Sequence, residues 1–362
     1  MRRTVTAFAL CVACSSTPQP SPDAAADAAT DVATDEPFFE EAAVLCPAPL
    51  GAPRARTMQP TPGPLDDALR MNHIQMKATH NSYHLRPTLQ IPAWDYSHAP
   101  LDVQLQDQGV RSVELDLHWN AFCERFEVYH LGTIDDLTTC RAFTQCLDTI
   151  RTWSDAHPSH HPLFIHLEPK DNYAASALEA RFAAMEREIL SVFPRELIVT
   201  PDEVRGSSPT VADAVRARGW PTLRASRGRV LFYIDRSDAF RTAYTHGGRD
   251  LEGRLAFVDS AMTDPFGAIL VINNATRVDD IGAAVRANFI VRVFSWGPND
   301  TDPARAPERV LATGAQIMST DVPAMAPGVT TWVEVPGGTP SRCNPLNAPM
   351  GCTSAAVESL AR

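Results

Sequence analysis

The most informative absence in this sequence of 362 residues is a long apolar run, because none that follows the N-terminal segment is long enough to span a bilayer. Positive charge is also scarce: 32 basic residues stand against 43 acidic ones, which argues against a general nucleic-acid binder. No Cys-x-x-Cys pair occurs after Cys14, which disfavours a zinc ribbon. No glycine-rich fingerprint follows the first predicted strand, which disfavours a dinucleotide-binding fold. At 44% hydrophobic and 21% charged residues, the composition is that of an ordinary globular protein.

The N-terminus has the pattern of a targeting signal. MRRTVTAFALCVAC combines two arginines with a short apolar stretch and ends in a segment that resembles a bacterial lipoprotein signal, with Cys14 as the lipidated residue. Cys11 stands where leucine is usual, and an ordinary secretory signal is the alternative. Acidic residues recur at every fourth position from Asp23 to Asp35, so their repulsion opposes a helix. We expect a signal peptide over residues 1–14, a disordered tether over 15–45 and one folded domain over 46–362.

The remaining cysteines fit an exported protein. Cleavage at the signal and lipidation of Cys14 leave six cysteines, and an even number in an oxidising compartment predicts disulfides. Cys140–Cys146 and Cys343–Cys352 are the natural local pairs, which leaves Cys46–Cys123. Free buried thiols are the alternative.

Short apolar runs alternate with helical patterns from about Asn72 onward. We expect strands at Ile74–Ala78, Val113–Leu117, Leu163–Leu167, Val230–Ile234, Ala268–Ile272, Ile290–Phe294 and Gln316–Ser319. We expect helices at Leu101–Gln108, Phe143–Trp153, Ala174–Val192, Val211–Arg218, Ile281–Ala287 and Pro303–Ala312. Strand followed by helix, repeated in this way, predicts a (β/α) barrel, with an open doubly wound sheet as the alternative. The Pro/Gly-rich tail is expected to wrap the barrel, clipped by Cys343–Cys352.

Polar side chains interrupt two of the predicted strands. In VELDLH, alternation places three aliphatic residues on one side and three polar ones on the other, namely Glu114, Asp116 and His118. A half-exposed strand explains this pattern by itself. Strands of a parallel barrel are covered on both faces, however, and inward carboxylates there repel one another unless a cation compensates. The strand that begins at Leu163 repeats the theme with Glu168 and Lys170 at its C-terminal end, where active sites of such barrels lie.

The candidate metal ligands all offer oxygen. They are one amide and three carboxylates: Asn81, Glu114, Asp116 and Glu168. Hard cations take such ligands, and calcium is the better choice for an exported protein with this many anionic groups. Zinc is the histidine-rich alternative. The residues between His80 and His84 do not have a helical pattern, so their spacing does not bring both rings to one face.

Two histidines near these ligands suit acid–base chemistry, because imidazole titrates near neutrality. His80 and His130 on either side of a cation fit phosphodiester cleavage, with one accepting a proton from the attacking hydroxyl and the other protonating the leaving alkoxide. Lys170 and Arg292 are candidates for holding the phosphate or another polar group of the substrate. A solvated surface charge is the alternative for both.

Five motifs together resemble the calcium-dependent bacterial phosphatidylinositol-specific phospholipase C family, which is akin to the catalytic barrel of eukaryotic phosphoinositide phospholipases C. They are KATHNSYH, GVRSVELDLHW, VYHLG, HPLFIHLEPKD and TGAQIMSTDVP, within roughly residues 70–352. The resemblance implies a distorted TIM (β/α)8 barrel with one catalytic Ca²⁺ held by the four oxygen ligands. It also implies His80 and His130 as the catalytic histidines and Lys170 near the phosphate. The implied reaction is attack by the inositol 2-hydroxyl on phosphorus, with diacylglycerol as the leaving group and an inositol cyclic phosphate as product.

Two other functions compete with this one. A glycerophosphodiester phosphodiesterase is similar in fold, metal and paired histidines but uses water as the nucleophile, and HNSY in place of His-Arg-Gly after the first strand argues against it. A non-catalytic surface lipoprotein that binds lipid headgroups would tolerate a lost histidine or carboxylate, and none is lost. The expected partner is a phospholipid at a membrane surface, and the expected state is a monomer without a transmembrane helix or bound nucleic acid.

Overall fold

The computed structural model describes residues 46–326, 329–337 and 340–358. In this part of the chain eight parallel strands follow the order β6-β5-β4-β2-β1-β9-β8-β7. Their bounds are β1 (Ile74–Thr79), β2 (Val110–Asn120), β4 (Leu163–Pro169), β5 (Val230–Ile234), β6 (Ala256–Val258), β7 (Ile269–Val271), β8 (Ile290–Phe294) and β9 (Ile317–Thr320). A bridge between Asp259 and Ile269 joins the end of β6 to β7, so the strands form a nearly closed barrel. The predicted distorted TIM (β/α)8 barrel is confirmed, and the open doubly wound sheet is excluded.

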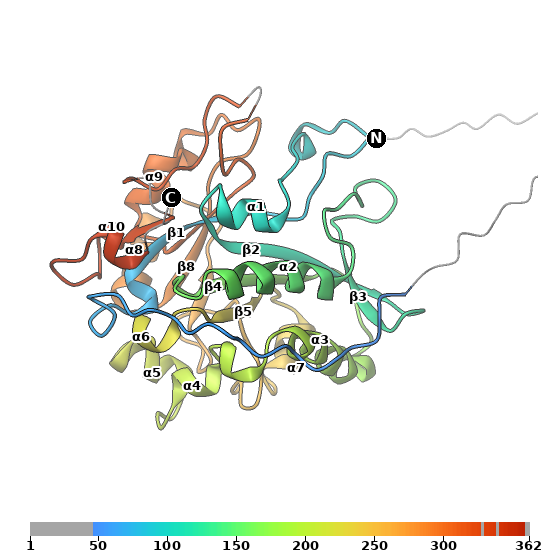
Figure 1. Ribbon diagram of the computed structural model, residues 1–362, viewed down its shortest axis with the longest axis horizontal. Coiled ribbons are helices and arrows are strands. Elements are labelled where there is room, and N and C mark those ends of the chain that lie inside the picture. The colour runs from blue at the N-terminus through green and yellow to red at the C-terminus, as the bar shows by residue number, and fades with distance from the viewer. Residues whose placement is uncertain (1–45, 327–328, 338–339, 359–362) are drawn as a thin grey trace, which may run out of the picture. The chain divides into compact units, whose positions relative to one another are not determined.

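Helices pack outside this barrel (Figure 1). They are α1 (Leu101–Gln106), α2 (Phe143–Ala156), α3 (Leu178–Val192), α4 (Pro201–Arg205), α5 (Val211–Arg218), α6 (Leu223–Ser226), α7 (Ala239–Tyr244), α8 (Val278–Arg286), α9 (Pro307–Ala312) and α10 (Ser354–Val357). Residues 259–268, all of which the structure describes, connect β6 to β7 without a helix. This missing helix, together with the single bridge at the same seam, is the distortion of the barrel.

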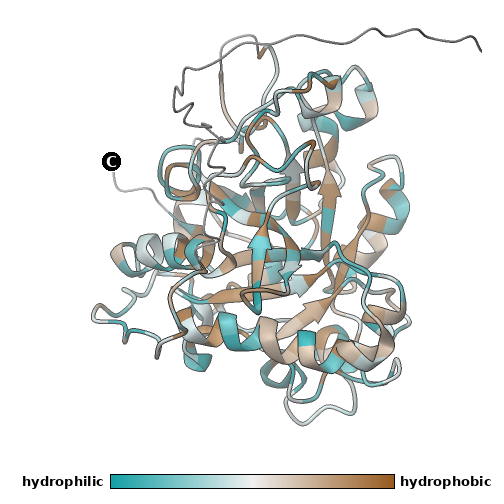
Figure 2. Ribbon diagram, turned by 90° about the vertical axis from the view of Figure 1, so that its right-hand side faces the viewer, coloured by the Kyte–Doolittle hydropathy of each residue, from teal (hydrophilic) through white to brown (hydrophobic). Residues whose placement is uncertain are grey.

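The strands bury both faces, as parallel barrel strands do. Val113, Leu115 and Leu117 of β2 belong to a hydrophobic cluster that also contains residues of α1, α2 and α3. The alternate residues of β2, Glu114 and Asp116, are buried on the opposite face. In Figure 2 the strands are mainly brown, and teal stretches interrupt several of them in the centre of the view. The predicted alternation along β2 is therefore confirmed.

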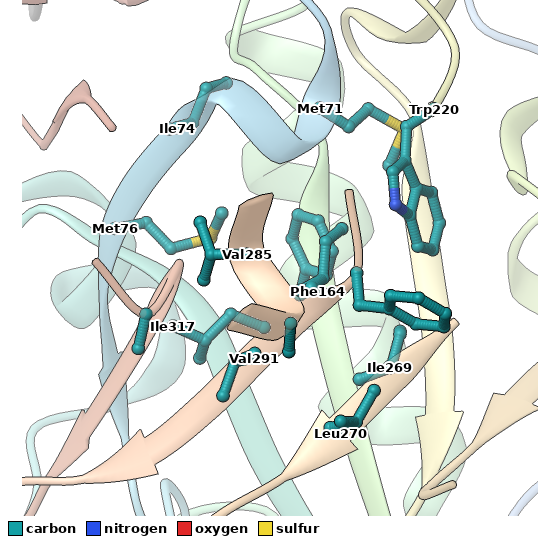
Figure 3. Packing of buried hydrophobic residues seen from close by; sticks show 14 of the residues in the cluster. Met71, Ile74, Met76, Phe164, Trp220, Ile269, Leu270, Val285, Val291 and Ile317 are labelled. Carbon is teal, nitrogen blue, oxygen red and sulfur yellow. The ribbon is translucent and has the colours of Figure 1, made fainter. Parts of the chain in front are cut away.

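A second hydrophobic cluster fills the other half of the domain. It combines side chains from β1, β4, β7, β8 and β9 with α8 and the segments before β1 and α6 (Figure 3). The labelled members are Met71, Ile74, Met76, Phe164, Trp220, Ile269, Leu270, Val285, Val291 and Ile317. On β4, the apolar Phe164 precedes His166 and Glu168 on the same face of the strand. Apolar packing therefore gives way to charged residues toward the C-terminal ends of the strands.

A hairpin extends β2 beyond its predicted end. β3 (Arg125–Val128) pairs antiparallel with β2, from Leu117 opposite Val128 to Asn120 opposite Arg125. This pairing explains why β2 runs to Asn120 instead of stopping at Leu117. The hairpin also returns the chain to the barrel mouth at His130, two residues after β3.

The three predicted disulfides are all present: Cys46–Cys123, Cys140–Cys146 and Cys343–Cys352. The first fastens the start of the described chain to the β2–β3 hairpin. The segment after Cys46 then runs along α2, where Arg56 Nη2 donates to Ser154 Oγ at 2.6 Å and Arg54 Nη2 donates to Thr152 Oγ1 at 2.8 Å.

The C-terminal tail closes the N-terminal end of the barrel. β10 (Ser341–Cys343) pairs antiparallel with the start of β1, and α10 contacts β10. Glu358 accepts a hydrogen bond from Arg111 Nε at 3.0 Å, at the start of β2, and another from the backbone N–H of His161 at 2.9 Å, just before β4. Burial alone would raise the pKa of Glu358, but Arg111 and His161 lower it to about 2. The opposite end of the barrel is left for the candidate site.

None of the helices among the described residues is long and apolar enough to cross a bilayer. The predicted signal peptide, the tether and the lipidation site Cys14 lie outside the described residues.

Candidate active site

Three carboxylates meet inside the barrel at the C-terminal ends of β2 and β4. Parallel register places Asp116 beside Glu168 and Glu114 two residues earlier on β2. One oxygen from each of the three carboxylates lies within 4.8 Å of the others. Asp116 is fully buried, and neither of its oxygens makes a well-oriented hydrogen bond in the structure. A buried carboxylate without such partners, next to two more, is the arrangement that a hard cation stabilises.

The protonation of these carboxylates reflects their crowding. Burial raises the pKa of Asp116 to about 7, with the charges of Glu168 and Glu114 adding to burial and Lys170 opposing it. Burial would also raise the pKa of Glu114, but His166, His80 and Arg292 hold it well below its usual range. Glu114 is thus kept ionised by the chain itself, whereas Asp116 lacks full compensation. A cation bound at the three oxygens would supply it.

Asn81 directly follows β1 and His80, and it is buried beside this cluster. Its φ of 45° is in the left-handed region, which asparagine tolerates better than most residues. The amide is fixed on both sides: Oδ1 accepts a hydrogen bond from Tyr83 Oη at 3.2 Å, and Nδ2 donates to Tyr96 Oη at 3.4 Å. Burial and the neighbouring Asp116 raise the pKa of Tyr83 well above its usual value. The amide oxygen therefore faces the region of the carboxylates.

His80 is held between two carboxylates. Its Nδ1 lies 2.7 Å from Oδ1 of Asp321, in the loop after β9, and its Nε2 lies 3.7 Å from Oε1 of Glu114. Burial lowers the pKa of His80, but Glu114 and Asp321 outweigh burial and raise it to about 9. The carbonyl oxygen of His80 accepts a hydrogen bond from His98 Nε2 at 2.8 Å. The ring is therefore oriented by Asp321, with Nε2 left on the side of Glu114.

His130 lies at the same end of the barrel, after the β2–β3 hairpin. Its Nδ1 is 2.6 Å from Oδ2 of Asp135, and its ring meets Trp94 edge-on with centroids 5.4 Å apart. Burial keeps the pKa of His130 below its usual value, although the hydrogen bond to Asp135 opposes this.

The two histidines line one cavity of about 580 Å³. Its wall includes both histidines, the amide next to the carboxylates and two aromatic rings: His80, Asn81, His130, Trp94 and Phe294. Phe294, at the end of β8, approaches the ring of His80 edge-on at 5.2 Å. A phosphodiester in this cavity would have one imidazole available as a base and a second as an acid.

The two predicted substrate-binding cations have different surroundings. Lys170 Nζ lies 2.9 Å from Oε1 of Glu168 and 3.1 Å from Oδ2 of Asp116, and its side chain remains 20% exposed. Arg292 of β8 is only 3% exposed, and its Nη2 donates to Oε2 of Glu114 at 2.7 Å. Lys170 is therefore placed at the mouth of the site, while Arg292 lies beneath Glu114.

Several residues that the sequence analysis left unassigned support this site. Asp321 belongs to the STDVP motif, but its contact with His80 spans 241 residues and no local spacing indicates it. Asp135 follows His130 by five residues, and an acidic residue so close to a candidate catalytic histidine was a usable signal. His84 points to Asp135 and not to the carboxylate cluster. Within the described ranges, the one group able to hold a metal contains no histidine, which disfavours the zinc alternative.

The family model for Ca²⁺-dependent phosphoinositide phospholipase C matches this sequence over residues 69–127 and 123–345. The chain belongs to this family. The matched residues include the whole candidate site and most of the described barrel. The protein is accordingly a phosphodiester-cleaving enzyme of the phospholipase C type, and calcium is the cofactor of its family. No functionally curated protein matches the chain significantly.

Solved structures of similar fold agree with the barrel described above. A Ca²⁺-dependent phosphatidylinositol-specific phospholipase C from Streptomyces antibioticus superposes with a TM-score of 0.54 at 21% identity, covering 70% of this chain and 95% of its own. A calcium-dependent phosphoinositol-specific phospholipase C from a Gram-negative Pseudomonas species gives a TM-score of 0.54 at 16% identity, covering 78% and 98%. A myo-inositol complex of the Pseudomonas enzyme gives 0.53 at 16% identity, with 78% and 98% coverage. At these identities the similarity concerns the fold.

Proposed function

We propose that this phospholipase cleaves phosphatidylinositol between phosphate and diacylglycerol, with the inositol 2-hydroxyl as the nucleophile and an inositol cyclic phosphate as the product. The observation that carries the proposal is that two carboxylate-paired histidines and Asn81 line one cavity beside a three-carboxylate cluster. A nucleophile within the substrate itself needs a base and an acid on opposite sides of phosphorus and no site for an activated water.

The proposed metal ligands are Asn81, Glu114, Asp116 and Glu168. Bound calcium would supply polarisation of the phosphoryl oxygen and a lower pKa for the attacking hydroxyl. The donors are all oxygen, three of them anionic, which is the ligand chemistry of calcium. The buried carboxylate of Asp116, whose charge Lys170 compensates only in part, is the feature of the site that most needs such a cation.

We assign the base to His80 and the acid to His130, roles that require the pKa of His80 to fall from about 9 when calcium takes up the charge of Glu114, and the lowered pKa of His130 to rise beside the negative phosphate. His80 Nε2 removes the proton of the inositol 2-hydroxyl while the new bond between that oxygen and phosphorus forms. As the bond from phosphorus to the glycerol oxygen breaks, His130 donates its proton to the departing alkoxide. Asp321 supports the first step because its hydrogen bond to Nδ1 fixes the tautomer and the orientation of His80.

Lys170 and Arg292 receive different roles in this proposal. Lys170 lies next to two of the proposed metal ligands and keeps part of its side chain open, which suits contact with the negative phosphate. Arg292 is closed off from solvent and bonded to Glu114, Ser319 and Asn273. We therefore propose that Arg292 orients Glu114, in place of the substrate contact expected from the sequence.

A membrane surface as the site of action is supported by the loops near His130. Leu131, Ile134 and Leu137 are 37%, 46% and 46% exposed in the segment that follows it, and Leu89 in the β1–α1 connection is 53% exposed. Exposed apolar side chains on loops at the mouth of a site favour contact with lipid. Export is supported by the three disulfides, which form in oxidising compartments. We also propose that the protein is anchored to the cell envelope by a lipid on Cys14, with secretion as the alternative. The proposed signal peptide ends at residue 14, and the proposed tether ends at residue 45.

To test the proposal, protein lacking residues 1–45 is incubated with phosphatidylinositol vesicles, first with calcium and then with a calcium chelator. Phosphorus NMR identifies the products. We expect a cyclic phosphodiester that forms with calcium and disappears in His80→Ala. His246→Ala is the control, because His246 contacts Asp250 in a surface turn. Cleavage of glycerophosphodiesters without cleavage of phosphatidylinositol would assign the protein to the water-using phosphodiesterases. Calcium binding without turnover of either substrate would indicate a headgroup-binding protein.

A further inference from the structure

The loop behind His130 holds a carboxylate between two histidines. Asp135 is fully buried, and each of its oxygens faces one imidazole. Oδ2 lies 2.6 Å from Nδ1 of His130, and Oδ1 lies 2.9 Å from Nε2 of His84. An ionised carboxylate only accepts hydrogen bonds, so both nitrogens carry their protons toward Asp135. His130 is left with Nε2 as its free nitrogen.

His84 differs from His130 in its access to the cavity. It is fully buried and not part of the cavity wall, whereas His130 lines it. The ring of His84 packs against the Tyr96 ring with centroids 4.4 Å apart, and its other nitrogen, Nδ1, lies 3.1 Å from the Tyr96 carbonyl oxygen, which accepts a hydrogen bond only when His84 carries both protons. A ring fixed on both sides and closed to substrate can act on the reaction only through Asp135.

The backbone makes these residues one unit. Leu131 and Asp135 exchange two backbone hydrogen bonds of 2.9 and 3.0 Å, which close the loop after His130. The same loop is joined to the turn after β1, where Thr139 N–H donates to the Tyr83 carbonyl at 2.8 Å and His84 forms a bridge with Thr138. The turn that carries His80 and the loop that supports His130 are therefore tied together.

We propose that His84 and Asp135 are positioning residues for His130, forming a His84–Asp135–His130 chain that presents Nε2 to the leaving-group oxygen. This inference rests on the proposed function, in which His130 is the acid. In the step itself, the proton passes from His130 Nε2 to the glycerol oxygen as its bond to phosphorus breaks. Nδ1 keeps its proton throughout, and Asp135 stays ionised, which balances the transfer without a proton moving along the chain.

His84 is needed because it gives the second oxygen of Asp135 a hydrogen-bond donor. Without a donor at Oδ1, a fully buried carboxylate would keep one oxygen unsatisfied, which is costly, and the carboxylate would turn or recruit another donor. Either change disturbs its bond to His130 Nδ1. With His84 in place, each oxygen has one fixed donor and the plane of the carboxylate is set. The effect of His84 on catalysis should therefore depend on how much the reaction needs an acid.

The experiment compares two substrates that differ in their need for that acid. Diacylglycerol leaves as a strongly basic alkoxide, whereas the 4-nitrophenyl ester of inositol 1-phosphate releases a weakly basic phenolate that needs little protonation. We expect Asp135→Asn to lower kcat for phosphatidylinositol by about 10²–10⁴-fold, because the amide favours the wrong tautomer. The same variant should lower kcat for the nitrophenyl ester by less than about 10-fold.

His84 is tested with two substitutions. His84→Leu removes the donor to Asp135 and should lower kcat for phosphatidylinositol by about 10- to 100-fold, with little change in KM. His84→Gln places an amide N–H near the position of Nε2, so its loss should be smaller than that of His84→Leu. The control is His118→Leu, because His118 Nε2 lies 3.2 Å from the backbone carbonyl of His130 and does not touch its ring. His118→Leu should change kcat by the same factor for phosphatidylinositol and for the nitrophenyl ester.

Nitrogen NMR of the imidazoles adds a readout that is independent of turnover. The wild type should show His130 protonated at Nδ1, and Asp135→Asn and His84→Leu should lose this signature while His118→Leu retains it. Equal losses on both substrates, or an unchanged His130 tautomer in both variants, would overturn the inference. A wild type that cleaves neither substrate would overturn the proposed function instead, and the NMR result would still decide whether His84 and Asp135 position His130. Thermal unfolding of each variant separates these effects from misfolding.

Discussion

Asp116 offers a test of the metal site in which stability and function change in opposite directions. Its carboxylate is fully buried among other carboxylates, and burial raises its pKa from 3.8 to about 7. A carboxyl whose pKa is raised by folding binds its proton more tightly in the folded state, so its ionisation destabilises the metal-free protein as the pH rises from about 4 through 7. The difference between these two pKa values corresponds to a loss of at most about 4 kcal/mol in the free energy of unfolding at pH 8.

Asp116→Asn should remove about 1–2 kcal/mol of this cost. We expect the calcium-free variant to unfold about 2–8 °C above the wild type at pH 8, given about 2–4 °C per kcal/mol for a domain of this size. The advantage should shrink as the pH falls toward 4, where the wild-type carboxyl is protonated. Calcium should raise the melting temperature of the wild type, because a ligand that binds the folded state stabilises it, and should leave the variant unchanged.

Glu188 provides the matched control. It is a buried carboxyl in α3, away from the metal cluster, and burial raises its pKa to about 7, although the backbone N–H of Phe126 opposes this. Glu188→Gln should therefore also stabilise the calcium-free protein at pH 8, yet keep the full response to calcium. Differential scanning fluorimetry and titration calorimetry with calcium measure both quantities. Calcium stabilisation that persists in Asp116→Asn, or a variant less stable than the wild type at pH 8, would refute the reasoning.

Three further predictions concern other charges of the barrel. Glu358→Gln should lower the free energy of unfolding by about 3 kcal/mol at pH 7, because Arg111 and His161 depress the pKa of the wild-type carboxyl. The difference in stability between wild type and variant should narrow as the pH falls from about 4.5 toward 2. Urea unfolding across this pH range measures that difference. Arg292→Met should destabilise the calcium-free protein by about 3–5 kcal/mol, and calcium should recover more stability than in the wild type, because it neutralises the Glu114 left unpaired. In NMR titrations of the calcium-free protein, His80 should show a pKa of about 9, and calcium should lower it by competing for Glu114; an unchanged pKa would contradict the proposed ligand.

The barrel was predictable because most of its strands carry a strong local signal. VLFYI and the alternation in VELDLH each indicate a strand without help from the rest of the chain, and the structure confirms both. β6 and β10 have three residues each and were not predicted, because their formation depends on pairing with Phe232–Ile234 and Ile74–Met76, which no local pattern reveals. The helices α4, α6 and α7 were missed for a different reason, because their apolar residues show little helical periodicity over so few positions.

The site was predictable where its chemistry is carried on strands. Strand alternation puts Glu114 and Asp116 on one face, and the register with β4 then brings Glu168 beside them. The residues that support the site come from loops, and no local sequence pattern reveals the path of a loop. Asp321 is 241 residues from His80 in the sequence and meets it because β9 pairs with β1, and His84 turns away from the carboxylate cluster because Asp135 lies on its other side. Arg292 was assigned to substrate because its burial beneath Glu114 could not be known from β8 alone.

The pairing of β1 with β10 bears on the timing of synthesis and transport. β1 can pair with β9 and β10 only after nearly the whole polypeptide has been made. Arg111 likewise pairs with Glu358, which lies 247 residues downstream. Contacts of such long range make folding slow relative to the emergence of the chain. For the exported protein proposed here, we expect the late closing strand to delay completion of the barrel until nearly the whole chain has been made.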